Sequence, residues 1–215
     1  TQASVKELQG MGIQPDIIVC RSEHPLDQGI KDKIALFCNV PNSHVLQNLD
    51  VKYLYEAPLA MEKEHLAEVA CECLHLDCPE PDLTDWKKMV DDLYAATHEV
   101  TIALVGKYTQ LHDAYISVVE ALKHGGIPQH TTVNIRWVDS EQVNADNVAD
   151  ILNGVDGVLV PGGFGDRGIE GMIDAIHYAR TNNIPFLGLC LGMQLSIVAV
   201  SYTHLRAHET EADLV

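Results

Sequence analysis

The sequence predicts an α/β fold built on an open, mostly parallel sheet. From about residue 100 onward, short apolar runs alternate with segments whose apolar residues recur at helical spacing. Strands that alternate with helices pair in parallel through right-handed crossovers. Two glycine-rich turns, Pro161–Gly165 and Gly188–Gly192, follow two successive apolar runs. Because ligands bind at the carboxyl edge of such sheets, we expect both turns to meet at that edge.

The first eighty residues predict a smaller set of α/β elements. Periodicity and punctuation by glycine and proline give their approximate positions. The expected elements are an amphipathic start at Val5 and Leu8 that breaks at Gly10–Gly12, a buried strand at Ile17–Cys20, an apolar element at Ile34–Phe37 and a helix over Leu59–Leu74.

A boundary is predicted at Pro79–Asp82, where two prolines alternate with acidic residues. Thr84 or Asp85 can then cap a helix that runs to Tyr94. The later strands are expected at Val100–Val105, Thr132–Val138, Gly157–Val160 and Ile184–Leu189, and the helices at Asp113–His124, Ala145–Leu152, Ile169–Arg180 and Leu191–Val200.

Cys190 stands at the centre of the second glycine-rich turn, Gly-Leu-Cys-Leu-Gly, between an apolar strand and a helix. Glycines on both sides permit a tight elbow that displays a nucleophile. A helix N-terminus also favours the thiolate, which is the form that attacks a carbonyl. The alternative is a structural cysteine buried between two glycines.

The first turn, Pro-Gly-Gly-Phe-Gly, ends the preceding strand. Gly162 and Gly163 would let backbone N–H groups approach a substrate oxygen closely, as the N–H of Leu191 would from the elbow. A simple turn is the alternative for this loop alone. The two motifs together are much more specific than either one.

These residues resemble a known family. Pro161–Gly165 and Gly188–Gln194 look like the first half of a class I (triad) glutamine amidotransferase domain. Gly12–Ser22 and Lys33–Cys38 resemble the end of the amidoligase domain of CTP synthases, and Val105–Tyr108 resembles the opening of their glutaminase domain. The fold implied is an incomplete amidotransferase sheet preceded by the C-terminal part of a P-loop-like α/β amidoligase domain.

The resemblance implies a cysteine glutaminase. Cys190 would be the catalytic nucleophile and would release ammonia from glutamine. Residues assigned to the glutamine pocket and oxyanion hole are Gly162, Gly163, Leu191, Gly192, Met193 and Gln194. The histidine and carboxylate that complete such a site come from later in the family's domain. His204 and Glu209 do not match that motif and are not assigned to it.

The resemblance also implies nucleotide chemistry, in which ATP activates the uracil O4 of UTP and ammonia displaces phosphate to give CTP. Thr1, Gln2 and Lys33 match UTP- and CTP-binding positions, and Asp50 and Val51 match positions near the adenine of ATP. Positions that respond to the allosteric activator GTP are matched by Phe164 and Arg167. The Mg²⁺ ligands and phosphate-binding loop are expected before residue 1, so no metal site is assigned. The family implies a homotetramer.

Composition agrees with a cytoplasmic enzyme. The 215 residues carry a net charge of −17, which argues against a nucleic-acid-binding face. No apolar run reaches the roughly 20 residues of a membrane span, and no signal peptide is evident. The six cysteines lack paired Cys-x-x-Cys spacing. Cys71, Cys73, His75 and Cys78 would point in different directions from a helix end, which disfavours zinc.

The expected organisation is an amidoligase part at 1–82, an interdomain helix at 83–98, half of an amidotransferase domain at 99–200 and a non-native tail at 201–215. We expect the chain to be a truncated piece of a longer protein, inactive in both half-reactions and prone to aggregation. The alternatives are another class I amidotransferase or cysteine hydrolase, and a non-catalytic module.

Overall fold

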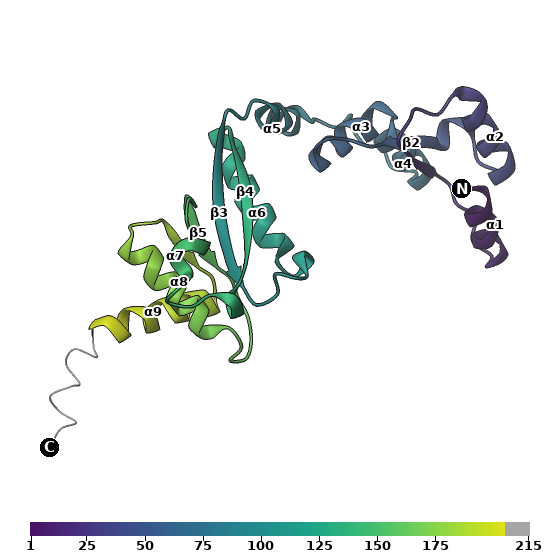
Figure 1. Ribbon diagram of the computed structural model, residues 1–215. Coiled ribbons are helices and arrows are strands. Elements are labelled where there is room, and N and C mark those ends of the chain that lie inside the picture. The colour runs from purple at the N-terminus through teal and green to yellow at the C-terminus, as the bar shows by residue number, and fades with distance from the viewer. Residues whose placement is uncertain (205–215) are drawn as a thin grey trace, which may run out of the picture. The chain divides into compact units, whose positions relative to one another are not determined.

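The computed structural model describes residues 1–204 and divides into two compact units. Unit 1 is Thr1–Asp91 and unit 2 is Asp92–Val215. Figure 1 follows the chain through both. The division falls within the segment 83–98, for which the role of an interdomain helix stays a prediction. Most of the expected tail at 201–215 lies outside the described residues.

Unit 1 contains a two-stranded parallel sheet flanked by helices (Figure 1). Ile18 pairs with Val45, and the register runs to Ser22 and Leu49. The core between sheet and helices includes Ile34 and Cys38. The elements are α1 Gln2–Gly10, β1 Ile18–Ser22, α2 Gln28–Cys38, β2 Val45–Leu49, α3 Ala57–Lys63, α4 Leu66–Leu74 and α5 Thr84–Tyr94, with short 3₁₀ turns at Asn42–His44 and Leu54–Glu56.

Two helices of unit 1 differ from the sequence prediction. The segment 59–74 is two helices, because His65 adopts a left-handed conformation with φ of 60° between α3 and α4. At α5, Thr84 is the first helical residue instead of the cap. Hydrogen bonds from the Thr84 hydroxyl and, to a lesser extent, from the Thr84 backbone N–H lower the pKa of the Asp82 carboxyl.

Unit 2 is built on a four-stranded parallel sheet in the order β4-β3-β5-β6. Strands and helices alternate along the chain, so the predicted α/β class with a parallel sheet is confirmed. The elements are β3 His98–Gly106, α6 Ile116–Gly126, β4 Thr131–Asp139, α7 Val148–Ile151, β5 Gly157–Val160, α8 Ile169–Thr181, β6 Phe186–Gly188 and α9 Leu191–His204, with 3₁₀ turns at His112–Tyr115, Ile127–Gln129 and Ser140–Gln142.

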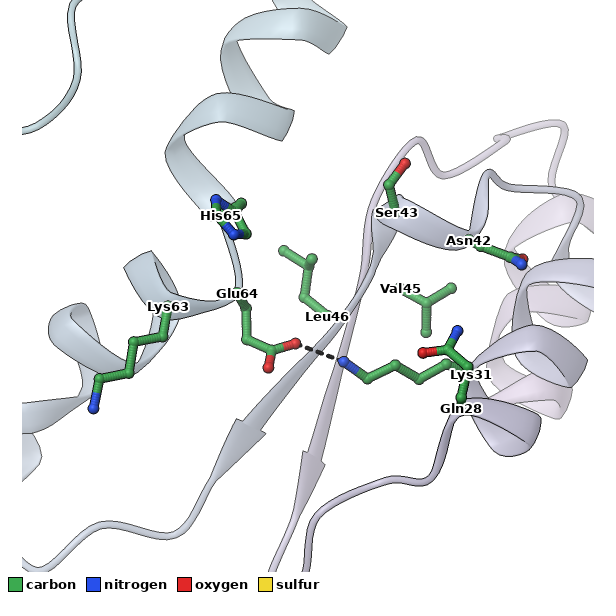
Figure 2. A pocket seen from close by; sticks show the side chains of 9 residues that line it. All are labelled: Gln28, Lys31, Asn42, Ser43, Val45, Leu46, Lys63, Glu64 and His65. Carbon is green, nitrogen blue, oxygen red and sulfur yellow. Dashed lines mark hydrogen bonds and ion pairs between the residues drawn. The ribbon is translucent and has the colours of Figure 1, made fainter.

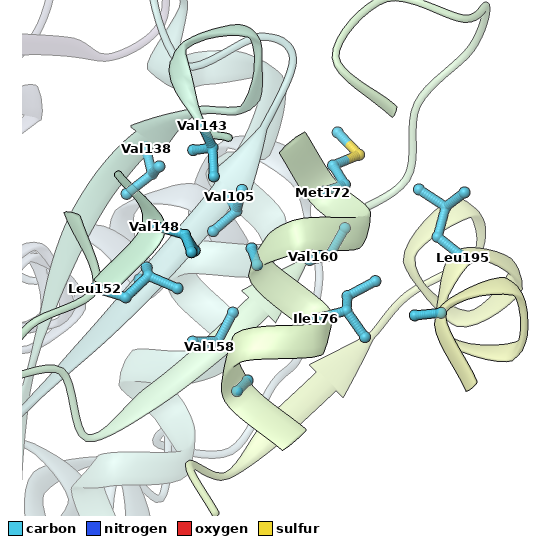
Figure 3. Packing of buried hydrophobic residues seen from close by; sticks show 14 residues of the cluster. Val105, Val138, Val143, Val148, Leu152, Val158, Val160, Met172, Ile176 and Leu195 are labelled. Carbon is cyan, nitrogen blue, oxygen red and sulfur yellow. The ribbon is translucent and has the colours of Figure 1, made fainter. Parts of the chain in front are cut away.

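Both faces of the unit 2 sheet are covered, as parallel sheets require. Side chains alternate between faces along β5, so Val158 and Val160 enter one cluster and Leu159 enters the other. The first cluster packs against α8 and α9 through Met172, Ile176 and other buried residues (Figure 3). The second packs against α6 and Tyr115. Among the described residues, no helix is both long and apolar enough to cross a membrane.

Candidate functional site

The elbow around Cys190 has the geometry of a displayed nucleophile. Cys190 lies between β6 and α9 with φ of 52°, a left-handed conformation that non-glycine residues rarely adopt. A Cβ on Gly188 would lie 2.6 Å from the backbone of Gly192, and a Cβ on Gly192 would overlap the carbonyl oxygen of Val160. Both glycines are therefore required by close backbone approach, and the Cys190 side chain is left exposed.

The Gly-Gly loop after β5 lies against this elbow. A Cβ on Gly162 would lie 3.6 Å from the Cβ of Cys190, and one on Gly163 would lie 3.4 Å from Cδ2 of Leu191. The Leu189 N–H donates to the Val160 carbonyl at 2.9 Å and holds the two chain segments together. The structure thus brings the two sequence motifs into one site at the carboxyl edge of the sheet.

Several backbone N–H groups at this site have no acceptor within residues 1–204. Those of Gly163 and Leu191 are among them, whereas the Gly192 N–H donates to the Leu189 carbonyl at 3.0 Å. Unsatisfied amides beside a nucleophile are suited to stabilising a developing oxyanion. Cys190 itself has no side-chain hydrogen-bond partner among the described residues.

Lys107, which was not assigned a role from the sequence, anchors the Gly-Gly loop. It follows β3, is only 4% exposed, and its Nζ donates to the carbonyl of Phe164 at 3.2 Å and to that of Gly165. Arg167 donates from Nη2 to the Lys107 carbonyl at 3.2 Å. The C-terminal part of the loop is consequently tied to the residue that follows β3.

Tyr115 supports the same strand end. Its hydroxyl oxygen accepts hydrogen bonds from the backbone N–H groups of Lys107 at 3.1 Å and Tyr108 at 3.3 Å. Burial raises the pKa of the Tyr115 phenol, and the two backbone donors oppose that effect only in part. Tyr115 therefore provides the acceptor for two backbone N–H groups just after β3 that take no part in strand pairing.

The other residues predicted for the glutaminase half lie around this core. Met193 and Gln194 occupy the first turn of α9 and are exposed. Phe164 is 89% exposed. Arg167 forms an ion pair with Glu141 at 2.7 Å, so its guanidinium already has two protein partners.

In unit 1, Asp50 and Val51 directly follow β2 at the carboxyl edge of the two-stranded sheet. Arg21 near the end of β1 meets Asp50 there, with Nη2 2.6 Å from Oδ1. The sequence analysis did not select Arg21, although a charged residue at the carboxyl end of a parallel strand is a usable signal. Thr1 and Gln2 lie at the start of α1 and Lys33 lies on α2, and all three are exposed.

A polar cavity of about 360 Å³ lies at the start of β2 (Figure 2). At this cavity, Nζ of Lys31 lies 2.7 Å from Oε2 of Glu64. The Lys63 side chain points away from this ion pair (Figure 2). Burial raises the pKa of Glu64, but hydrogen bonds from Lys31 and Gln47 outweigh it, so the pKa is lowered overall. None of the sequence-predicted site residues lines this cavity. The Lys31 and Glu64 charges are already paired with each other, which indicates a structural role.

Within residues 1–204, which include the cysteine-rich end of α4, no group of three or more His, Cys, Asp or Glu side chains could hold a metal ion. None of the described residues is assigned to Mg²⁺.

Comparison with known proteins agrees with this geometry. The family model for class I glutamine amidotransferases matches residues 110–212, which include the elbow and the Gly-Gly loop. This defines unit 2 as an amidotransferase domain of that class. The family model for the CTP synthase N-terminus matches residues 1–76. Taken together, the two matches and the relatives below show that the chain belongs to the CTP synthase family.

The relatives carry the same two parts in one protein. The CTP synthase of Ruminiclostridium cellulolyticum is 55% identical over 212 residues, covering 99% of this chain and 40% of that protein. That of Clostridium perfringens is 58% identical over 198 residues, covering 92% and 37%. The chain spans about 40% of the length of the curated relatives. A structure titled as the Trypanosoma brucei CTPS glutaminase domain with bound acivicin matches with 44% identity, covers 47% of this chain and 40% of that one, and has a TM-score of 0.45.

Proposed function

We propose that this chain is part of an enzyme that synthesises CTP, in which UTP is aminated at the expense of ATP with ammonia from glutamine. The observation that carries the proposal is the contact between the Gly162–Gly163 loop and the Cys190 elbow, in a chain whose first part matches the CTP synthase N-terminus. The described residues supply parts of both half-reactions.

In the glutaminase half-reaction, the Cys190 thiolate attacks the side-chain amide carbon of glutamine. The N–H groups of Gly163 and Leu191 donate to the oxyanion of the tetrahedral intermediate. Its collapse breaks the C–N bond, releases ammonia once the nitrogen is protonated, and leaves a γ-glutamyl thioester on Cys190. Gly192, Met193 and Gln194 line the glutamine pocket beside the thiol. Water then hydrolyses the thioester to glutamate.

In the amidoligase half-reaction, the carboxyl edge of the β1–β2 sheet receives nucleotide. Asp50 and Val51 contact the adenine of ATP, and the exposed Arg21 beside Asp50 belongs to the same site. Thr1, Gln2 and Lys33 bind UTP or CTP. Phe164 and Arg167 take part in the response to GTP. When bound, Mg²⁺ would neutralise phosphate charge, through ligands other than the described residues.

A homotetramer and a cytoplasmic location complete the proposal. On α2, Leu36 is 79% exposed and Phe37 is 63% exposed, and an interface between copies would cover such apolar side chains. Light scattering coupled to size exclusion would measure the assembly. A monomer at all protein concentrations would contradict the tetramer for this chain.

The glutaminase assignment is tested by labelling with 6-diazo-5-oxo-L-norleucine, an electrophile shaped like glutamine. Peptide mass spectrometry would compare adducts at Cys190 and at Cys78, which is also exposed. We expect selective labelling of Cys190 that free glutamine suppresses. Iodoacetamide, which has no glutamine shape, provides the control and should label both cysteines. Equal labelling of both cysteines by the glutamine analogue would contradict the proposed glutamine site.

A further inference from the structure

Lys107 is a buried charged residue to which the proposed half-reactions assign no step. It directly follows β3, an inner strand of the unit 2 sheet, and is 4% exposed. Both of its backbone polar groups have partners, because its N–H donates to the Tyr115 hydroxyl and its carbonyl accepts from Arg167. The Lys107 side chain therefore extends from a firmly held position at the carboxyl edge of the sheet.

This side chain meets the Gly-Gly loop in two ways. Its Nζ donates to the carbonyl of Phe164 at 3.2 Å and to that of Gly165. Its aliphatic part lies beside Gly163, where an added Cβ would be 3.4 Å from Cδ of Lys107 and 3.6 Å from Cε. The same Cβ would lie 3.4 Å from Cδ2 of Leu191. The side chains of Lys107 and Leu191 thus limit the position of Gly163.

The Lys107 ammonium group carries its charge without a carboxylate partner in residues 1–204, where its acceptors are the two loop carbonyls. The Arg167 guanidinium, by contrast, pairs with Glu141 at 2.7 Å. A buried charge without an opposite charge is unfavourable for folding. Such a charge is useful where negative charge develops during a reaction. The placement of Lys107 against the Gly163 loop therefore indicates a role in the chemistry of the site.

We propose that Lys107 is a positioning residue for the glutaminase reaction, which holds the Gly163 N–H where it donates to the oxyanion formed at Cys190. This inference rests on the proposed glutaminase function. The ammonium group binds the two carbonyls that follow Gly163, and the aliphatic part packs beside Gly163 itself. The donor is consequently in place before the substrate arrives. Donors fixed in advance stabilise the developing charge without rearranging during the reaction.

A first experiment measures the positioning directly. Lys107→Met keeps an apolar side chain of similar length but removes its hydrogen-bond donors. In the 215-residue chain, NMR relaxation of the backbone amides gives the order parameter of the Gly163 N–H. We expect about 0.85 in the wild type, as for rigid backbone, and less than about 0.6 in Lys107→Met. Lys123→Met removes an exposed lysine from α6 of the same unit and should keep the wild-type value.

A second experiment separates binding from the covalent step. The ketone oxygen of 6-diazo-5-oxo-L-norleucine takes the place of the amide oxygen of glutamine, so it meets the same donors. The rate of Cys190 labelling at several reagent concentrations gives the half-saturating concentration KI and the limiting rate kinact. Lys107→Met should lower kinact about tenfold, less than the roughly 100-fold that a 1 Å misplacement can cost, and leave KI within about twofold.

Two further measurements distinguish positioning from general damage. Lys107→Arg keeps the charge and the donors, so it should recover part of the kinact that Lys107→Met loses. Iodoacetamide needs no oxyanion donor and should label Cys190 at the same rate in all of these proteins. Circular dichroism checks that each variant is folded. A parallel fall in iodoacetamide labelling would overturn the inference, because the thiol itself would then have been displaced.

The remaining outcomes separate this inference from the function on which it rests. An unchanged Gly163 order parameter in Lys107→Met would overturn the role of Lys107, whatever reaction the site performs. So would a wild-type value below about 0.6, a result that needs no variant. If glutamine fails to suppress Cys190 labelling in the wild type, the glutaminase function itself is contradicted and the inference falls with it.

Discussion

The two sheet edges of this chain position their candidate residues by different means. In unit 2, Cys190 is placed by backbone contacts, because Gly188 and Gly192 approach other backbone atoms too closely for any side chain. In unit 1, Asp50 is held by Arg21 in an ion pair whose side chains are 49% and 69% exposed. Exposed ion pairs contribute little to stability. The sheet edge at Cys190 is therefore coupled to folding, whereas the sheet edge at Asp50 can change without disturbing its unit.

The chain provides a separate reporter for each edge. Its two tryptophans are Trp86, which donates from Nε1 to the Tyr55 carbonyl in unit 1, and Trp137 in β4 of unit 2. Replacing one of them by phenylalanine leaves fluorescence that follows unfolding of the other unit. Unfolding of each unit is measured in the variant that keeps the tryptophan of that unit.

The largest effect is expected for Gly192→Ala. The new methyl group would overlap the Val160 carbonyl, which can move only if the contact between β5 and α9 opens. We expect a loss of about 3 kcal/mol in unfolding free energy, as for severe overpacking. Urea unfolding followed by Trp137 fluorescence measures it.

Gly125→Ala is the matched control, since a Cβ at Gly125 meets no atom within 4 Å and the residue lies in α6. It should be neutral or slightly stabilising. Equal stability of Gly192→Ala and Gly125→Ala would contradict the contrast between the two sheet edges, because the elbow would then tolerate a side chain at residue 192.

Tyr115→Phe should cost about 2 kcal/mol in unit 2, because it leaves two backbone N–H groups at the end of β3 without their acceptor. Phenylalanine keeps the packing of the aromatic ring, so the loss of unfolding free energy reports the contribution of the hydroxyl alone. Trp137 fluorescence during urea unfolding is again the measurement. Wild-type stability in this variant would mean that water replaces the hydroxyl without cost.

Glu64→Gln should cost about 1 kcal/mol in unit 1 at neutral pH, through weaker hydrogen bonds to Lys31 and Gln47. The folded-state pKa of Glu64 lies below its unfolded value. Its contribution is therefore complete above the unfolded pKa and is lost as pH falls through the lowered folded pKa. Urea midpoints from Trp86 fluorescence should decline with acid more steeply for wild type than for the variant. Parallel pH profiles would refute this role.

Arg21→Ala should have the smallest effect on stability, no more than about 0.5 kcal/mol in unit 1, since its partner contact is exposed. Calorimetric titration with ATP should nevertheless show weaker binding than wild type. Lys6→Ala on α1 removes the same charge from another element of unit 1 and serves as the matched control. A stability loss above about 1 kcal/mol, which exceeds what exposed ion pairs contribute, or unchanged ATP binding would remove the contrast between the two edges.

Much of the geometry around Cys190 was predictable, because its parts carry local signals. Glycine on both sides of Cys190 and the Gly162–Gly163 pair mark positions where backbone must approach backbone. The supporting residues were not found this way. The Tyr115 hydroxyl accepts hydrogen bonds from the backbone N–H groups of Lys107 and Tyr108, just after β3. The residues next to Tyr115 in the sequence give no sign of that contact. Lys107 directly follows a strand, which was the available signal for it.

The two errors in unit 1 have different causes. The break between α3 and α4 occurs at His65, where no glycine or proline marks a left-handed residue. Strand β2 was not predicted, since only Val45 and Leu46 are buried in it and the remaining positions are intermediate. Its pairing with β1 across an intervening helix decides its conformation. Tertiary pairing thus accounts for the second departure, whereas the first lies in the backbone conformation of His65.

The strand order in unit 2 has a consequence for synthesis on the ribosome. The central strands β3 and β5 pair with each other and β4 flanks β3, whereas β6 joins last in the sequence at an edge. A sheet of three strands can therefore assemble as the chain emerges, before Cys190 has left the exit tunnel. The turn at Cys190 is then completed only against a Val160 carbonyl that is already in place. Vectorial folding in this order means that the elbow forms last, on a sheet that is already assembled.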